Sequence, residues 1–170
     1  GASTLRDSLI VGIRPLSIRG PDLYYADRRY VMRIVDFPRG VENAGSEEDV
    51  LARCLDSGSV PLLRHPAPSI LSQATQQGVL LAVELESTDP SSVIVELQQL
   101  ARWPAVGMVI LPEGLMMEMP LPPPASSLLR SVVYLPDRPV PPWAQVLIVE
   151  EPLLNDTSLQ AVNCPQMVCC

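Results

Sequence analysis

The sequence predicts an α/β fold, specifically an incomplete or compressed (β/α)8 barrel of the TIM type. Seven short runs rich in Val, Ile and Leu have the length of strands, and most lack the polar alternation of a half-solvated sheet. Helix-like segments separate the first runs, as in a parallel sheet. The chain has 170 residues, fewer than the roughly 200 to 250 of a complete barrel. The seven runs cover residues 30–35, 60–63, 79–84, 106–111, 131–135, 145–149 and 166–170.

Residues 1–29 are predicted to form an N-terminal β segment and hairpin that lead into the barrel of residues 30–170. Apolar stretches occur at 10–13 and 16–18, and a hairpin pattern follows with its turn near Asp27. In a barrel, such a hairpin covers the N-terminal end. We expect one structural domain overall, because the length suits a single substantial core.

Three helices are predicted between the first four strands. Ser46, followed by acidic residues, has the pattern of an N-cap for a helix that ends at Gly58. A second helix over residues 69–77 ends at Gly78. The third begins at Asp89-Pro90 and ends before Pro104.

The connections after residue 112 are predicted to be abbreviated. Many of the 19 prolines lie there, three of them consecutively at 122–124, and residues 137–143 leave no room for a helix. A crossover between parallel strands normally takes a dozen or more residues. The second half of the barrel is therefore expected to lack full crossover helices.

Composition excludes several classes of function. All twelve basic residues are Arg, which removes Schiff-base and phosphate-loop lysines, and His65 is the only His. The four Cys have no metal-site spacing, so we expect no metal and no cofactor.

The net charge of -7 argues against a nucleic-acid partner. No apolar run reaches the roughly 18 residues of a membrane span, and no signal peptide is visible, so the cell compartment stays open.

Several motifs occur in a recognisable order between residues 11 and 113. Residues 11–14 read Val-Gly-Ile-Arg, residues 23–33 form the hairpin and first strand, and residues 47–64 form a helix and a strand ending in Arg. Residues 65–68 read His-Pro-Ala-Pro, residues 77–84 read Gln-Gly-Val-Leu-Leu-Ala-Val-Glu, and residues 103–106 read Trp-Pro-Ala-Val. This order resembles the central barrel of the family 2 glycoside hydrolases, which include β-galactosidases and β-glucuronidases.

The resemblance implies a Glu acid/base at the end of the fourth strand and a Glu nucleophile at the end of the seventh. An ungapped match places Glu113 one residue before the acid/base position, and residues 166–170 contain no carboxylate. A retaining enzyme needs two carboxyl groups about 5 to 5.5 Å apart. Glu113 is the candidate residual acid/base, and Glu84 or Glu150 is the acid that could face it across a barrel mouth.

Arg64 and His65 follow the second strand, on the face where barrels bind ligands. They join Glu84 and Glu150 as candidate ligand-binding residues. The alternative for Arg64 is a structural ion pair with Glu84, and the alternative for Glu113 is a turn residue.

We therefore expect a non-catalytic, glycosidase-like barrel that serves as a binding or scaffolding module within a larger protein, with a carbohydrate or a protein as its partner. One alternative is an active retaining glycosidase whose nucleophile strand lies outside this sequence. A second is a protein–protein assembly domain that uses its acidic, Pro-rich surface.

Overall fold

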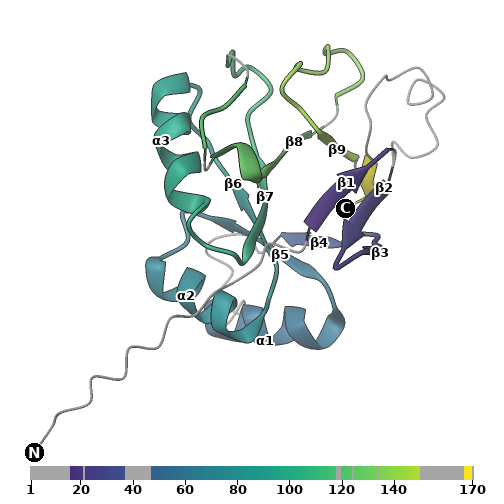
Figure 1. Ribbon diagram of the computed structural model, residues 1–170, viewed down its shortest axis with the longest axis vertical. Coiled ribbons are helices and arrows are strands. Elements are labelled where there is room, and N and C mark those ends of the chain that lie inside the picture. The colour runs from purple at the N-terminus through teal and green to yellow at the C-terminus, as the bar shows by residue number, and fades with distance from the viewer. Residues whose placement is uncertain are drawn as a thin grey trace, which may run out of the picture.

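The computed structural model describes residues 16–20, 22–36, 47–117, 120–123, 125–133, 135–149 and the backbone of 167–169. They form two sheets, three α-helices and one short 3₁₀ helix (Figure 1). The strands are β1 (Leu16–Arg19), β2 (Asp22–Tyr25), β3 (Arg28–Arg29), β4 (Ile34–Asp36), β5 (Val60–Arg64), β6 (Leu81–Glu84), β7 (Val106–Ile110), β8 (Leu129–Val133), β9 (Val146–Val149) and β10 (Met167–Cys169). The helices are α1 (Glu47–Ser57), α2 (Pro68–Gln77), α3 (Pro90–Leu100) and the 3₁₀ helix η1 (Ala125–Ser127).

The larger sheet is an open half-barrel, so the predicted (β/α)8 barrel is wrong. Its seven strands are parallel and follow chain order from β4 at one edge to β10 at the other. The described part of the chain contains three α-helices, whereas a (β/α)8 barrel has eight. After β7 the Pro-rich connections leave room only for η1 among the described residues. In the described connections after β7, the helix layer that surrounds a closed barrel is therefore absent.

The described helix ends carry residue types that favour them. α2 starts with Pro68, whose missing N–H is not needed in a first turn, and Gly78 follows its end with a φ of 71°. Asp89 caps α3 by accepting a hydrogen bond from the Ser92 amide at 2.8 Å. Hydrogen bonds from the hydroxyl and the amide of Ser92 lower the pKa of Asp89. Ser46, the predicted N-cap of the first helix, lies outside the described residues.

The outer face of the parallel sheet packs against the helices in the first half and against loops in the second. Leu51 of α1, Leu71 of α2 and Leu97 of α3 belong to one buried cluster with alternate strand residues. Trp143, in the loop between β8 and β9, belongs to the same cluster and is 1% exposed. Its indole N–H donates to the carbonyl of Leu115 at 2.8 Å, so the polar atom is satisfied in the core.

The small antiparallel sheet of β1, β2 and β3 packs against the inner face of the parallel sheet. Leu16 of β1 and Leu23 of β2 are buried in one cluster with Leu80 and inner-face strand residues. The pairing of β6 with β7 shifts register here, with Gly107 as the extra residue. A Cβ at Gly107 would lie 2.5 Å from Cδ1 of Leu80 and 3.2 Å from Cδ2 of Leu16. Glycine at this position therefore allows the hairpin to approach the sheet closely.

The strands β2 and β3 form a hairpin with its turn at the predicted place. Tyr25 pairs with Arg28 across a two-residue turn, in which Ala26 and Asp27 have φ values of 47° and 63°. Two consecutive positive φ values are typical of the type I′ turn that matches strand twist. Asp27 also forms an ion pair with Arg19 of β1. The predicted β segment at 10–13 and the motif at 11–14 lie outside the described residues.

Candidate functional site

Three charged side chains meet where the strands β4, β5 and β6 end. β4 ends at Asp36, β5 at Arg64 and β6 at Glu84. Arg64 and Glu84 are direct register partners, and Asp36 pairs with Leu62, two residues before Arg64. Because side chains alternate along a strand, all three lie on the same face of the sheet. We call Asp36, Arg64 and Glu84 the carboxyl-edge cluster.

Arg64 is the centre of this cluster. Its Nη1 and Nη2 donate to Oδ1 and Oδ2 of Asp36 at 2.8 and 3.0 Å. Its Nε lies 2.6 Å from Oε2 of Glu84. The hydrogen bonds with Asp36 are the main cause of a raised Arg64 pKa. Arg64, expected as a ligand-binding residue, is therefore engaged by two carboxylates and connects the ends of three strands.

His65 lies beside the cluster and is more exposed. Its backbone φ is 50°, and its Nε2 lies 3.8 Å from Oε2 of Glu86. The side chains are 53% and 59% exposed, and the pair is ionic only when the imidazole is protonated. Such an exposed pair contributes about 0 to 1 kcal/mol. His65 also borders a separate cavity of about 330 Å³ that includes Trp103.

Glu84 and Glu113 line one pocket of about 310 Å³ at the carboxyl end of the sheet. Oε1 of Glu113 lies 3.4 Å from Nη1 of Arg138. Oε2 of Glu84 and Oε2 of Glu113 are buried, and neither accepts a hydrogen bond from the residues that the structure describes. Oε2 of Glu84 nevertheless lies beside Nε of Arg64, so the guanidinium compensates its charge. We call this cavity the edge pocket; its other lining residues are Leu85, Glu86, Ile110, Leu111, Pro112, Val132, Val133 and Leu135.

The structure brings together three of the five residues expected at a functional site. Glu84 and Glu113 share the edge pocket, and Arg64 contacts Glu84. His65 lies next to Arg64 but does not line this pocket. Glu150 lies outside the described residues.

The described part of the chain offers no metal site. It contains no group of three or more His, Cys, Asp or Glu side chains that could hold a metal ion. Cys54 is buried, and burial raises the pKa of its thiol, so it behaves as a core side chain. Within the same residues, no helix is both long and apolar enough to cross a membrane.

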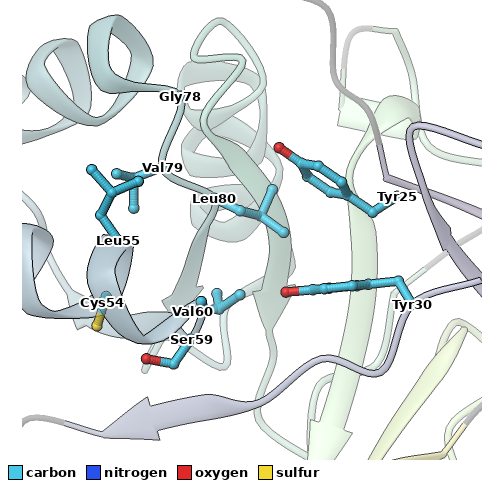
Figure 2. Close-up of a pocket in the computed structure, with 10 residues that line it drawn as sticks. Tyr25, Tyr30, Cys54, Leu55, Ser59, Val60, Gly78, Val79 and Leu80 are labelled. Atoms are coloured by element: carbon cyan, nitrogen blue, oxygen red, sulfur yellow. The ribbon is translucent and has the colours of Figure 1, made fainter. Parts of the chain in front are cut away.

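A third cavity, of about 220 Å³, lies at the opposite, amino end of the parallel sheet (Figure 2). Tyr25 and Tyr30 form its aromatic wall, with ring centroids 5.5 Å apart and ring planes inclined by 42°. Burial, with a smaller contribution from Tyr25, raises the pKa of Tyr30, so its hydroxyl is a neutral donor. We call this cavity the base pocket; its remaining lining residues are Cys54, Leu55, Gly58, Ser59, Val60, Gly78, Val79 and Leu80.

The base pocket was not predicted from the sequence. Its tyrosines belong to a hairpin that was expected only to cover the end of a barrel, and its other wall comes from two helix–strand turns later in the chain. Two aromatic residues that flank a short hairpin turn are the signal that could have located it.

Comparison with known proteins gives no match: no family model matches the chain, and neither a curated protein nor a solved structure does. The resemblance to family 2 glycoside hydrolases therefore stays a prediction. The functional argument depends on the geometry of the two pockets.

Proposed function

We propose that this chain is a non-catalytic binding module whose edge pocket takes a small hydroxylated ligand, with carbohydrate as the class that fits best. One observation carries the proposal. The pocket presents a buried carboxylate oxygen, Oε2 of Glu113, that accepts no hydrogen bond from the described residues, and it shares the pocket with Glu84, whose Oε2 lies in the ion pair with Arg64. A buried acceptor without a donor costs about 1 to 3 kcal/mol, and more when it is charged. A ligand hydroxyl would supply the missing donor to Glu113.

The rest of the pocket supports the same ligand class. Apolar side chains such as Ile110, Val133 and Leu135 surround the two carboxylates. Small-molecule sites commonly combine a mainly apolar lining with a few polar groups that set orientation. A sugar ring has carbon-bound faces for the apolar walls and hydroxyl edges for the carboxylates. The volume of about 310 Å³ suits one small ligand.

The charge arrangement favours binding over hydrolysis. A glycosidase of the usual kind needs one carboxyl group that donates a proton and a second that is ionised. Here Glu84 lies 2.6 Å from Nε of Arg64, and Glu113 lies 3.4 Å from Nη1 of Arg138. Both carboxylates therefore have an arginine partner, whereas a hydrolase places its two carboxyl groups in different environments, and this likeness supports binding.

The test is a screen of neutral saccharides, followed by calorimetric titration of any that bind. We expect the Glu113→Gln variant to weaken binding about tenfold or more, because a hydrogen bond to a charged acceptor contributes about 1.5 to 3 kcal/mol. Glu96→Gln is the matched control, since Glu96 lies on α3 and does not line the edge pocket. If no saccharide binds, or if Glu113→Gln binds as tightly as the parent, the proposal is wrong.

The second candidate function is glycoside hydrolysis by the same two residues. The observation that favours it is the presence of both carboxylates, Glu84 and Glu113, in one pocket. We expect no release of aglycone from a panel of aryl glycosides. Release that disappears in Glu113→Gln and persists in Glu96→Gln would establish the hydrolase and overturn the non-catalytic proposal.

A further inference from the structure

The base pocket combines an aromatic wall with an aliphatic interior, and it is independent of the edge pocket. Figure 2 shows the rings of Tyr25 and Tyr30 extending from the hairpin toward Leu80. Val60, Val79 and Leu80 contribute aliphatic surface. The volume of about 220 Å³ is below the roughly 300 to 1,000 Å³ of pockets for drug-sized ligands, so the pocket suits a small molecule.

The two tyrosine rings provide a surface that attracts cations. The face of an aromatic ring carries partial negative charge, and a cation within about 6 Å of the ring centre is stabilised by it. On the same hairpin, the guanidinium of Arg19 already lies 5.0 Å from the ring centre of Tyr24. Within the described residues, the structure records no such cation over Tyr25 or Tyr30.

The helices α1 and α2 both end at the base pocket. Gly58 and Gly78, which follow their last residues, line the pocket with φ values of 65° and 71°. The carboxyl end of a helix carries about half a unit of negative charge on its unpaired carbonyls. Neither helix has a basic residue in its last turn, and α1 has Asp56 there. The field from both helix ends therefore favours a positive charge.

Among the described residues that line the base pocket, none is basic. Arg53 on α1 acts electrostatically on the Cys54 thiol, but its side chain is exposed and does not line the pocket. The mostly apolar lining also lacks the set of oxygen ligands that a metal ion requires. The pocket therefore suits a cation whose charge is covered by carbon.

We propose that the base pocket binds a small quaternary ammonium cation of the choline type. The methyl groups of such a cation contact Val60, Val79 and Leu80, while its charge faces the two tyrosine rings and the two helix ends. Recognition of quaternary ammonium groups by aromatic side chains is a known use of cation–π attraction.

The first test compares choline chloride with 3,3-dimethyl-1-butanol by isothermal titration calorimetry. The alcohol has the same shape, but carbon replaces the charged nitrogen. We expect choline to bind about 2- to 30-fold more tightly, the range that one cation–π contact provides. Equal affinity for both compounds, or no binding at the highest choline concentration titrated, would overturn the proposal.

The second test changes the aromatic wall. Tyr30→Phe keeps the ring and is expected to retain choline binding, whereas Tyr30→Leu is expected to weaken it by the same 2- to 30-fold. Tyr24→Leu is the matched control, because Tyr24 lies on the same strand as Tyr25 and does not line the pocket. Circular dichroism checks that the Tyr30→Leu variant is folded. A folded Tyr30→Leu variant that binds choline as tightly as the parent would contradict the proposal.

The third test is an exposed substitution that leaves the aromatic wall intact. Leu55, 53% exposed at the pocket, is changed to Arg and, as the control, to Gln. We expect Leu55→Arg to abolish choline binding by placing a cation at the entrance, and Leu55→Gln to retain it. Equal affinities of the two variants would contradict the electrostatic argument. Co-sedimentation with phosphatidylcholine vesicles without binding of free choline would overturn the assignment of a small free ligand.

Discussion

The two halves of the parallel sheet cover the same kind of buried strand in different ways. In the first half, α1, α2 and α3 place side chains such as Leu71 and Leu97 on the outer face of the sheet. In the described second half, loops do this, with Trp143 as their largest buried side chain. The buried cluster is continuous across both halves. The comparison teaches that the outer face requires an apolar layer but not a helical one.

The largest expected effect tests whether the loop layer is as well packed as the helix layer. We expect Trp143→Ala to lower the free energy of unfolding by about 3 to 5 kcal/mol, because it removes a fully buried aromatic side chain and its hydrogen bond to Leu115. The matched variant in the helix layer is Leu97→Ala, which is expected to cost about 2 to 5 kcal/mol. Urea unfolding measures both. A loss below about 1 kcal/mol for Trp143→Ala, with the full loss for Leu97→Ala, would show that the loops are not a packed layer.

A smaller expected effect comes from backbone strain, which we test at one glycine in each half of the molecule. Gly78 ends α2 with a φ of 71°, and a Cβ there would meet nothing within 4 Å, so Gly78→Ala introduces strain without a steric clash. We expect a loss of about 1 to 2 kcal/mol in urea unfolding. Gly114→Ala, in the loop after β7, is the control, because its site is equally open and its φ lies outside the left-handed region. Equal effects of the two substitutions would contradict this reasoning.

The smallest expected effect concerns the N-cap of α3 and depends on pH. Hydrogen bonds from Ser92 lower the pKa of Asp89 below its unfolded value of about 3.9. The cap therefore stabilises the fold fully above that value, and its contribution is lost as the pH falls through the lower folded pKa. Asn is also a good N-cap, so Asp89→Asn removes the charge while keeping the cap. We expect the parent to have the higher Tm at pH 7, with the difference vanishing in strong acid. A difference independent of pH would contradict the prediction.

The predicted strand starts differ from the observed ones by up to four residues in the first half, where the run at 30–35 precedes β4 (Ile34–Asp36), and by up to two in the second. The run at 106–111 corresponds to β7 (Val106–Ile110), but the run at 131–135 was placed two residues late, because β8 begins at Leu129 and contains Arg130. The sequence did not indicate a buried strand at Arg130, because a charged side chain is rarely buried. Arg130 is tolerated because its Nε and Nη1 donate to the carbonyls of Trp143 and Leu128, both at 3.3 Å. Whether the sheet closes into a barrel could not be predicted from the sequence either, because closure depends on contacts between the first and last strands.

The charged site was easier to predict than the aromatic one. Alternation along adjacent parallel strands is enough to suggest that Arg64 lies beside Glu84, and the structure shows this pair at 2.6 Å. The buried Oε2 of Glu113, which accepts no hydrogen bond from the described residues, depends on side-chain conformation, which the sequence does not encode locally. The base pocket arises where a hairpin meets two helix ends, so only tertiary packing reveals it.

The order of the strands in the parallel sheet has a consequence for folding during synthesis. From β5 onward, each strand of the parallel sheet pairs with the strand synthesised immediately before it. When each of these strands leaves the ribosome, the strand with which it pairs has therefore already been synthesised. The sheet can grow in the direction of synthesis. The small antiparallel sheet is the exception, because Leu16 of β1 is synthesised well before Gly107 of β7, beside which it packs. β1 can therefore dock against the parallel sheet only after β7 has been synthesised.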